Sequence, residues 1–274
     1  KPDLLWQLQL SQDIQPDLDE DYYEVAAFAT IYYAPGQREA AEELAHTVLN
    51  SVVKRKRERE CNVIYKESCE ESFNLYSYTI RAPNISSLSL HYGDEFERVV
   101  HPRILAGLTQ PDATGIVLLY GEPGTGKTNY IRHLVQEIAD KQLIYVPAVM
   151  AGCLAEPAFL PFLLENKKSL LLGDDAESFV VAADRSENNK SIANILNLSS
   201  GLLGDSLRMP LIVTFNCPAS KIEPALLRNG RLIASHQFTN LPVDRAQQLS
   251  EQLGFATTIA EPMCLADIYA QGNS

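Results

Sequence analysis

An apolar run over residues 116–120 stops at a glycine-rich loop, and an amphipathic helical pattern begins directly after it. From Gly121 to Thr128 the loop reads Gly-Glu-Pro-Gly-Thr-Gly-Lys-Thr, which fits the pattern G-x-x-x-x-G-K-[ST]. Glycine tolerates backbone conformations that other residues resist, so such a loop can curl until its N–H groups form a nest for anions at a helix N-terminus. A chance glycine-rich turn is the alternative, but it would not need the strand and the helix beside it. The order of strand, loop and helix therefore predicts a P-loop.

The last two residues of this P-loop have the chemistry that a nucleoside triphosphate requires. The Lys127 ammonium can reach the β- and γ-phosphates, and the Thr128 hydroxyl can hold Mg²⁺. We therefore expect the chain to bind a nucleoside triphosphate together with Mg²⁺. The expected nucleotide-binding residues of this segment are Gly121, Glu122, Pro123, Gly124, Thr125, Gly126, Lys127, Thr128 and Asn129.

Composition limits the classes of protein to which the chain can belong. Its 274 residues suggest about two domains, and 46% hydrophobic with 21% charged residues is ordinary for a soluble globular protein. The formal net charge of −12 argues against a general nucleic-acid binder, because phosphate backbones need a positive protein face. The five cysteines are scattered and odd in number, which is typical of reduced thiols rather than of a disulfide framework.

The hydropathy of the sequence indicates whether the chain could span a membrane. No apolar run approaches the roughly 20 residues of a membrane span, so we expect a cytoplasmic protein without a membrane partner. The sequence begins at Lys1 rather than at a methionine, which leaves open whether a native segment precedes it.

Residues 1–88 read as a small α+β domain in which nothing resembles a catalytic site. In order, we expect a short helix or arm within residues 1–20, a strand over 24–33, an amphipathic helix over 37–59 and strands over 61–66 and 73–81. The helix would end in a basic run over residues 54–60. That run is favoured as a solvated last turn, where cations suit the helix dipole, over a contact with nucleic acid or a partner.

After residue 88, strands alternate with helices. We expect a helix over 95–108, the P-loop strand from 115, a helix over 126–140, a strand over 143–146, a helix over 157–165, a strand over 169–173, a helix over 191–203 and a strand over 211–216. Such alternation predicts an α/β fold, with a mostly parallel sheet and helices on both faces.

Two carboxylates follow a buried strand downstream of the P-loop. A P-loop needs such a group at the end of a neighbouring strand to complete its Mg²⁺ site. Asp174 and Asp175 follow the apolar run 170–173, where ligands bind in open α/β sheets. We assign Asp174 to Mg²⁺ and Asp175 to orienting or activating the attacking water. An acidic turn after a core strand is the alternative.

Two later segments add polar groups. Asn216 ends a buried strand, where its amide can bond a γ-phosphate or the attacking water; a turn-forming Asn is the alternative. Arg228 and Arg231 flank a turn, and arginine suits the charge that develops in phosphoryl transfer, where it can contribute ~10³–10⁵ in rate. The alternative for these two arginines is a helix end that is capped by Asn-Gly and has cationic residues in its last turn.

These segments, in this order, resemble the motifs of the AAA+ ATPases. The motifs read Gly-Glu-Pro-Gly-Thr-Gly-Lys-Thr, then apolar-Asp-Asp-Ala-Glu, then Thr-Phe-Asn, then Pro-Ala-Leu-Leu-Arg-Asn-Gly-Arg. The likeness is to the AAA branch in particular, whose second region of homology reads Thr-Asn and then Pro-Ala-Leu-Leu-Arg-Pro-Gly-Arg. It covers about residues 88–270, and the likeness to mitochondrial translocase members of that branch is distant.

The resemblance implies roles for the motif residues. It implies ATP or ADP as the nucleotide, a Walker A motif at 121–128, a Walker B motif at 170–175 and a γ-phosphate sensor at Asn216. One of the two arginines, Arg228 or Arg231, would reach into the site of a neighbouring subunit. The resemblance therefore implies a homo-oligomeric ring, usually of six.

The resemblance also implies an adenine-side wall and a lid. Tyr92 and Gly93 would lie near adenine, and a reduced C-terminal helical lid would occupy 243–253 and 262–270. The expected domains are thus an N-terminal α+β domain over 1–88, which recognises a partner or substrate, a nucleotide-binding domain over 89–240, and a lid over 241–274.

Two departures from the family pattern bear on activity. The usual catalytic glutamate is Asp175 here, one methylene shorter, so we expect slow or conditional hydrolysis, with Glu177 as an alternative base. The stretch 148–152 stands where protein-threading relatives carry an aromatic residue, and it has none.

We expect an ATP hydrolase that remodels an unknown protein client. The alternatives are a nucleotide-gated switch or scaffold with little hydrolysis and, less favoured, a loader that acts on nucleic acid.

Overall fold

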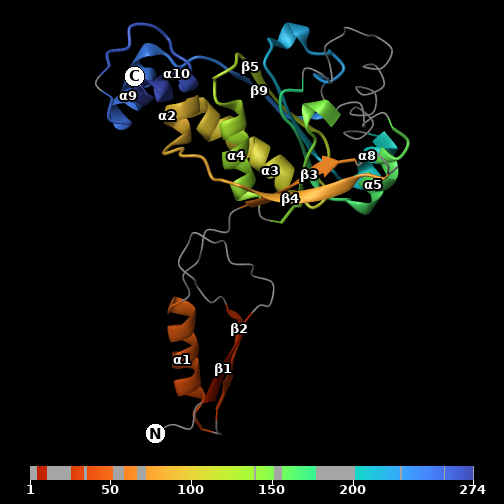
Figure 1. Cartoon of the computed structure of the whole chain (residues 1–274), viewed down its shortest axis with the longest axis vertical. Coiled ribbons are helices and arrows are strands. Elements are labelled where there is room, and N and C mark those ends of the chain that lie inside the picture. Colours follow the sequence, from red (N-terminus) through yellow and green to blue (C-terminus); the bar gives the residue numbers. More distant parts are fainter. Residues whose placement is uncertain are drawn as a thin grey trace. The chain divides into compact units, whose positions relative to one another are not determined.

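The computed structural model (Figure 1) describes most of the chain in ten stretches. These are residues 5–10, 26–33, 36–51, 59–66, 72–138, 140–150, 156–176, 201–228, 230–255 and 257–273. The chain divides into two compact units, residues 1–57 and 58–274. The expected boundary near residue 88 therefore differs from the division in the structure.

The first unit contains a two-stranded antiparallel sheet and one helix. Strand β1 (Leu5–Leu10) pairs with β2 (Ala26–Tyr32), and helix α1 spans Arg38–Ser51. The expectation of a helix or arm at the start of the chain is wrong for β1, because Leu-Trp-Gln-Leu-Gln-Leu alternates apolar and polar residues with the period of a strand. The expected helix over 37–59 is also wrong at its end, since Arg59 begins a strand; residues 54–58 of the basic run lie outside the described residues.

The second unit is built on a seven-stranded sheet with the order β4-β3-β6-β7-β8-β5-β9. All neighbours are parallel except β3 and β4, which form an antiparallel hairpin at one edge. The strands are β3 (Arg59–Tyr65), β4 (Asn74–Ile80), β5 (Ile116–Gly121), β6 (Leu143–Tyr145), β7 (Leu170–Gly173), β8 (Leu211–Phe215) and β9 (Leu232–Phe238). The predicted α/β fold with a mostly parallel sheet is confirmed.

Helices cover both faces of this sheet (Figure 1). They are α2 (Leu88–Tyr92), a π-helical turn (Phe96–Val100), α3 (His101–Thr109), α4 (Lys127–Glu137), α5 (Phe159–Glu165) and α8 (Gly201–Leu207). Side chains alternate between the faces along each strand. Val117 and Leu119 of β5 pack in one cluster with α3 and α4, whereas Ile116 and Leu118 pack in another with α5 and α8. This double burial explains why the central strands are continuous apolar runs.

The hairpin of β3 and β4 joins the main sheet rather than a separate N-terminal domain. Asn62 and Val63 of β3 pair in parallel with Ile144 and Tyr145 of β6. Cys61 and Ile64 are buried in the clusters on opposite faces. This edge pairing joins segments some 80 residues apart, which explains why the sequence alone did not place the boundary.

The C-terminal segment forms a small helical body with a core of its own. Helix α9 (Val243–Gln252) and helix α10 (Leu265–Ala270) lie within the two segments expected as a lid. Leu249 and Ile268 are central to their shared cluster, and a bridge between Leu241 and Met263 ties its ends. Among the described helices of the chain, none has the length and apolar character that crossing a membrane requires.

Candidate nucleotide-binding site

The P-loop begins where β5, buried at the centre of the sheet, ends. Gly121 has φ +141°, and a Cβ at this position would collide with the backbone carbonyl of Phe238 in β9. Gly124 and Gly126 also have positive φ, so the loop turns in the way that only glycine accepts without strain. Gly121 is thus required by close backbone packing, and Gly124 and Gly126 by the curl of the loop.

Lys127, the first residue of α4, directs its ammonium back into the loop. Its Nζ donates to the carbonyl oxygens of Gly121 at 3.0 Å and Glu122 at 2.8 Å, and the residue is 5% exposed. The Thr125 hydroxyl donates to the Glu122 oxygen at 2.7 Å and closes the same turn. A buried cation held by loop carbonyls lies where phosphate oxygens are expected to bind.

A pair of oxygen ligands lies beside the loop. The Thr128 hydroxyl donates to Asp174 Oδ2 at 2.9 Å, although 46 residues separate them in the chain. The other carboxylate oxygen, Oδ1, accepts from the Thr214 hydroxyl at 2.5 Å. Hydroxyl and carboxylate oxygens are the ligands that Mg²⁺ takes, so the side chains present fit this ion. The structure brings together the two residues that the sequence assigned to the metal.

Thr214 is a site residue that the sequence reasoning missed. It lies in β8 with 0% exposure, and its hydroxyl both donates to Asp174 and accepts the Asp175 N–H at 2.9 Å. One hydroxyl therefore fixes the carboxylate and the backbone after it. The available signal was a single hydroxyl within the otherwise apolar strand Leu211–Phe215.

Asp175 and Asn216 are also brought together. The Asn216 amide donates to Asp175 Oδ1 at 2.5 Å, and Asp175 has the left-handed φ of +52°. Aspartate is among the few residues other than glycine that adopt this region with any frequency. The backbone turn after β7 thus directs the exposed carboxylate of Asp175 toward the end of β8. Glu177, the alternative base, lies outside the described residues.

The two arginines lie at the opposite end of β5 from the P-loop. The carbonyl oxygen of Arg231 accepts the N–H of Ile116, the first residue of the strand, at 2.8 Å. The six residues of β5 span roughly 20 Å at about 3.3 Å per residue, so neither arginine is brought to the P-loop of its own chain. Arg231 Nη1 donates to the Ala225 oxygen at 3.2 Å, whereas the Arg228 side chain is exposed. Asn229 of this turn lies outside the described residues.

Tyr92 and Gly93 border the loop from α2. The Tyr92 hydroxyl donates to the carbonyl oxygen of Gly126 at 3.2 Å, and burial raises the pKa of this phenol. A Cβ at Gly93 would come within 2.9 Å of Arg245 Nη1, on α9, and Arg245 pairs with Asp94 at 3.3 Å. The expected adenine-side segment therefore connects the P-loop to α9. Asn129, also expected at the nucleotide, lies exposed in the first turn of α4.

Helix α10 contacts the P-loop directly, which the sequence reasoning did not anticipate. The backbone N–H of Ala266 donates to the Gly124 oxygen at 2.9 Å. A Cβ at Gly124 would lie 3.0 Å from Cys264 Sγ. Cys264 caps α10 by accepting the Asp267 N–H.

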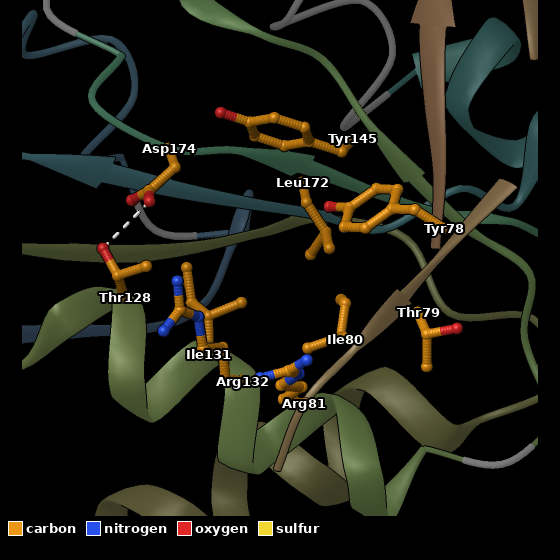
Figure 2. A pocket seen from close by; sticks show the side chains of 10 residues that line it. All are labelled: Tyr78, Thr79, Ile80, Arg81, Thr128, Ile131, Arg132, Tyr145, Leu172 and Asp174. Atoms are coloured by element: carbon orange, nitrogen blue, oxygen red, sulfur yellow. Dashed lines mark hydrogen bonds between the residues drawn. The ribbon is translucent and has the colours of Figure 1, made fainter. Parts of the chain in front are cut away.

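A pocket of about 410 Å³ opens beside the Thr128–Asp174 pair, between α4 and the ends of β4, β6 and β7 (Figure 2). Its floor is apolar, and the guanidinium groups of Arg81 and Arg132 border it. Burial, with the nearby charges of Asp174 and Asp175, raises the pKa of the Tyr145 phenol. Its lining residues are Tyr78, Thr79, Ile80, Arg81, Thr128, Ile131, Arg132, Tyr145, Leu172 and Asp174.

The segment expected at the pore-loop position is described only in part. Val149 is 92% exposed, and residues 151–152 lie outside the described residues.

Part of the chain is similar to known proteins. Residues 117–240 match the family described as "ATPase family associated with various cellular activities (AAA)". The probable mitochondrial chaperone bcs1 of Schizosaccharomyces pombe is 27% identical over 165 residues, which cover 57% of this chain and 35% of that protein. An ORC1-type DNA replication protein of Thermoplasma acidophilum is 44% identical over 50 residues, 17% of this chain and 14% of that protein.

The chain spans about a third or less of the length of these two relatives. The family match begins at Val117 in the P-loop strand and ends just before the bridge that opens the C-terminal helical body. It thus covers the P-loop, the two carboxylates, Asn216 and both arginines. Residues 117–240 thus match the AAA ATPase family, and the chain is distantly similar to the bcs1 chaperone.

Proposed function

We propose that this chain binds ATP with Mg²⁺, hydrolyses it, and couples hydrolysis to the remodelling of a protein partner. The observation that carries the proposal is the hydrogen bond between Thr128 and Asp174, which unites the P-loop with the carboxylate of a neighbouring strand. Bound Mg²⁺ would supply charge neutralisation at the β- and γ-phosphates. Lys127 and the loop N–H groups bind and orient those phosphates.

Asp175 is proposed to hold the attacking water and to accept its proton. The Asn216 amide is its hydrogen-bond partner and keeps the carboxylate at the end of β8. The backbone of Asp175 is held in turn by the Thr214 hydroxyl. The aspartate side chain is one methylene shorter than the glutamate usual in the family, so we expect slow turnover.

The arginines are proposed to act on the site of a neighbouring copy. This is supported by their place at the far end of β5 from the P-loop of their own chain. Arg228 is the better candidate for this role, because its side chain is exposed, whereas Arg231 bonds the carbonyl of Ala225. A homo-oligomeric ring would bring each Arg228 to the nucleotide of the next subunit.

The client is proposed to be a protein. One relative of this chain is named a chaperone, and the net charge of −12 disfavours nucleic acid. The first unit, which has an exposed pair of aromatic side chains at Tyr32 and Tyr33, is the proposed recognition element. A cytoplasmic location is part of the same proposal.

A nucleotide-gated switch is the second candidate. It is favoured by the short carboxylate of Asp175 and by its close contact with Asn216, at 2.5 Å, which competes with a bond to water. Such a protein would bind ATP and change its partner contacts without appreciable turnover.

Steady-state hydrolysis separates the two candidates. The comparison uses the wild type, Asp175→Asn and Asp175→Glu, with Asp205→Asn in the exposed part of α8 as the matched charge control. An ATPase loses its rate in Asp175→Asn alone and keeps or gains rate in Asp175→Glu. Equal and negligible rates in all four proteins, with ATP still bound, would leave only the switch.

Mass in solution, measured with and without ATP, tests the ring. Lys127→Ala serves as the control that cannot hold the phosphates. A monomer under every condition would exclude catalysis by the arginine of a neighbouring copy.

A further inference from the structure

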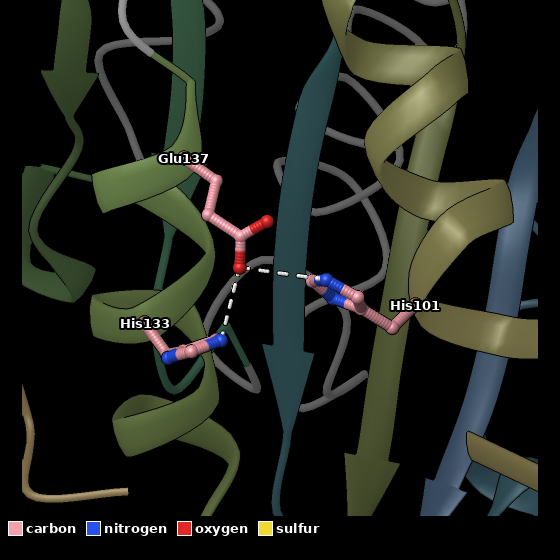
Figure 3. A group of neighbouring side chains, drawn as sticks. All are labelled: His101, His133 and Glu137. Carbon is pink, nitrogen blue, oxygen red and sulfur yellow. Dashed lines mark ion pairs between the residues drawn. The ribbon is translucent and has the colours of Figure 1, made fainter. Parts of the chain in front are cut away.

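Three side chains that could bind a metal ion meet between α4 and α3 (Figure 3). His133 and Glu137 lie one turn apart on α4, and His101 is the first residue of α3. Glu137 Oε1 lies 3.0 Å from His133 Nε2 and 3.4 Å from His101 Nε2. The three ligand atoms all lie within 4.8 Å of one another. None of these residues takes part in the nucleotide site proposed above.

The spacing of the ligand atoms fits a tetrahedral ion. Zn²⁺ binds His nitrogen and carboxylate oxygen at about 2.0–2.2 Å, which places two tetrahedral ligands roughly 3.3–3.5 Å apart. The contact from His101 to Glu137 has this length already, and that from His133 needs a shift of a few tenths of an ångström. Two imidazoles and one carboxylate are a ligand set that leaves a fourth position for water.

A second partner orients the His101 ring. Its Nδ1 lies 3.1 Å from the Tyr130 hydroxyl, a contact that is buried. A ring nitrogen engaged in this way leaves Nε2 as the ligand atom, and metal-binding histidines are commonly fixed by such a partner on the other nitrogen. Tyr130 is itself held by ring contacts with Tyr92 and Phe96, so the orientation of His101 depends on a packed aromatic cluster.

An ion pair explains only part of the arrangement. His133 and Glu137 lie four residues apart on one helix face and would pair without any metal. That pairing does not require the second imidazole, which comes from another helix, is 8% exposed and directs Nε2 at the same carboxylate oxygen. A cation between the three groups would bond all of them at once. His133 is partly exposed and gives an ion a path from solvent.

We propose that His101, His133 and Glu137 bind a divalent transition-metal ion of the Zn²⁺ class. The ion joins α3 to α4, the helix whose first residues are Lys127 and Thr128 of the P-loop. Its effect is to hold the P-loop helix to α3.

Zinc binding to the whole protein tests the site. The protein is stripped with a chelator, dialysed into excess Mg²⁺ to fill the Thr128–Asp174 site, and titrated with Zn²⁺ by calorimetry. The variants are His133→Gln and Glu137→Gln, and the matched control is Glu165→Gln at the exposed end of α5. We expect one Zn²⁺ per chain in the wild type and the control, and an affinity lower by about tenfold or more in both variants.

Tyr130→Phe adds a readout specific to orientation. It keeps the ring and removes the hydroxyl, and we expect it to weaken Zn²⁺ binding roughly 10–100-fold. Co²⁺ in place of Zn²⁺ reports the ligands through its visible spectrum. Circular dichroism checks that each variant is folded. If His133→Gln is misfolded, the comparison of the wild type with Glu137→Gln decides the test.

Two results would overturn the site. Zinc affinity equal in the wild type, His133→Gln and Glu137→Gln would mean that these groups form an ion pair only. A Co²⁺ spectrum with thiolate bands would assign the ion to cysteine instead.

Discussion

The backbone N–H of Ala266 donates to the carbonyl oxygen of Gly124 at 2.9 Å, so the C-terminal helical body is hydrogen-bonded directly to the P-loop. Cys264, at the start of the same helix, packs beside Gly124 as well. Movement of α10 and the conformation of the loop are therefore mechanically linked.

Removing this hydrogen bond should weaken nucleotide binding. Ala266→Pro lacks the N–H but keeps a backbone suited to the first turn of a helix. We expect about a fivefold weaker affinity for ATP, corresponding to roughly 1 kcal/mol for one lost hydrogen bond. Ala266→Gly keeps the N–H and is the matched control, and fluorescence titration with labelled ATP is the measurement. Equal affinity of the two variants would show that the bond does not support the loop.

Thr214→Val should reduce both activity and stability. Valine has the shape of threonine but leaves the Asp175 N–H and the Asp174 carboxylate without their shared partner. An unsatisfied buried group costs about 1–3 kcal/mol, which urea unfolding would detect. Hydrolysis of ATP should fall in parallel, because both carboxylates lose their positioning. Thr214→Ser restores the hydroxyl and should recover the rate; failure to recover it would assign the effect to packing.

Mixing two inactive proteins should restore hydrolysis. Lys127→Ala loses phosphate binding and Arg228→Ala loses the proposed charge on the neighbouring site, so each ring of one variant should be inactive. An arginine acting in this way can contribute about 10³–10⁵ in rate. A mixed ring contains sites with an intact Lys127 next to an intact Arg228, and their hydrolysis should appear after subunit exchange. Inactivity of the mixture, with exchange verified by mass, would contradict catalysis in trans. Arg231→Ala is expected to act through the turn that bonds Ala225 instead.

Stability should fall in mild acid because of His236. Burial lowers the pKa of this imidazole from 6.5 to about 4, and the ring packs against Phe96 and Phe238. Between pH 6.5 and 4 this histidine is protonated in the unfolded chain and neutral in the folded chain. The free energy of unfolding is therefore largest above pH 6.5 and decreases as the pH falls toward 4. The decrease is roughly 3 kcal/mol at most. Urea unfolding at pH 7 and pH 5 should show a smaller difference for His236→Phe than for the wild type. An unchanged difference would assign the acid sensitivity to other groups.

The sequence predicted the parts of the fold whose signal is local. The P-loop, the run before Asp174 and the run before Asn216 each combine a short apolar strand with a polar end, and the structure has strands at all three. The helical stripe after Lys127 likewise matches α4. The three strands are buried on both faces and α4 on one, so their patterns do not depend on any particular neighbour.

Features that depend on pairing between distant segments escaped the sequence reasoning. Strand β9 (Leu232–Phe238) mixes buried and exposed residues because it lies at the sheet edge, and its register against β5 contains an irregularity. The residues of the β3–β4 hairpin do not indicate that β3 pairs with β6. Thr214 and Ala266 act through a hydroxyl and a backbone N–H, groups that every sequence offers in many places.

The hydrogen bond from the Ile116 N–H to the carbonyl of Arg231 holds the arginine turn at the opposite end of β5 from the P-loop. At one end the strand delivers the chain into its own P-loop, and at the other it supports the turn that carries Arg228. In the proposed ring, each β5 would thus connect the ATP site of its own subunit with that of the next. A shift of the arginine turn on sensing the γ-phosphate next door would pull on the strand that carries Gly121.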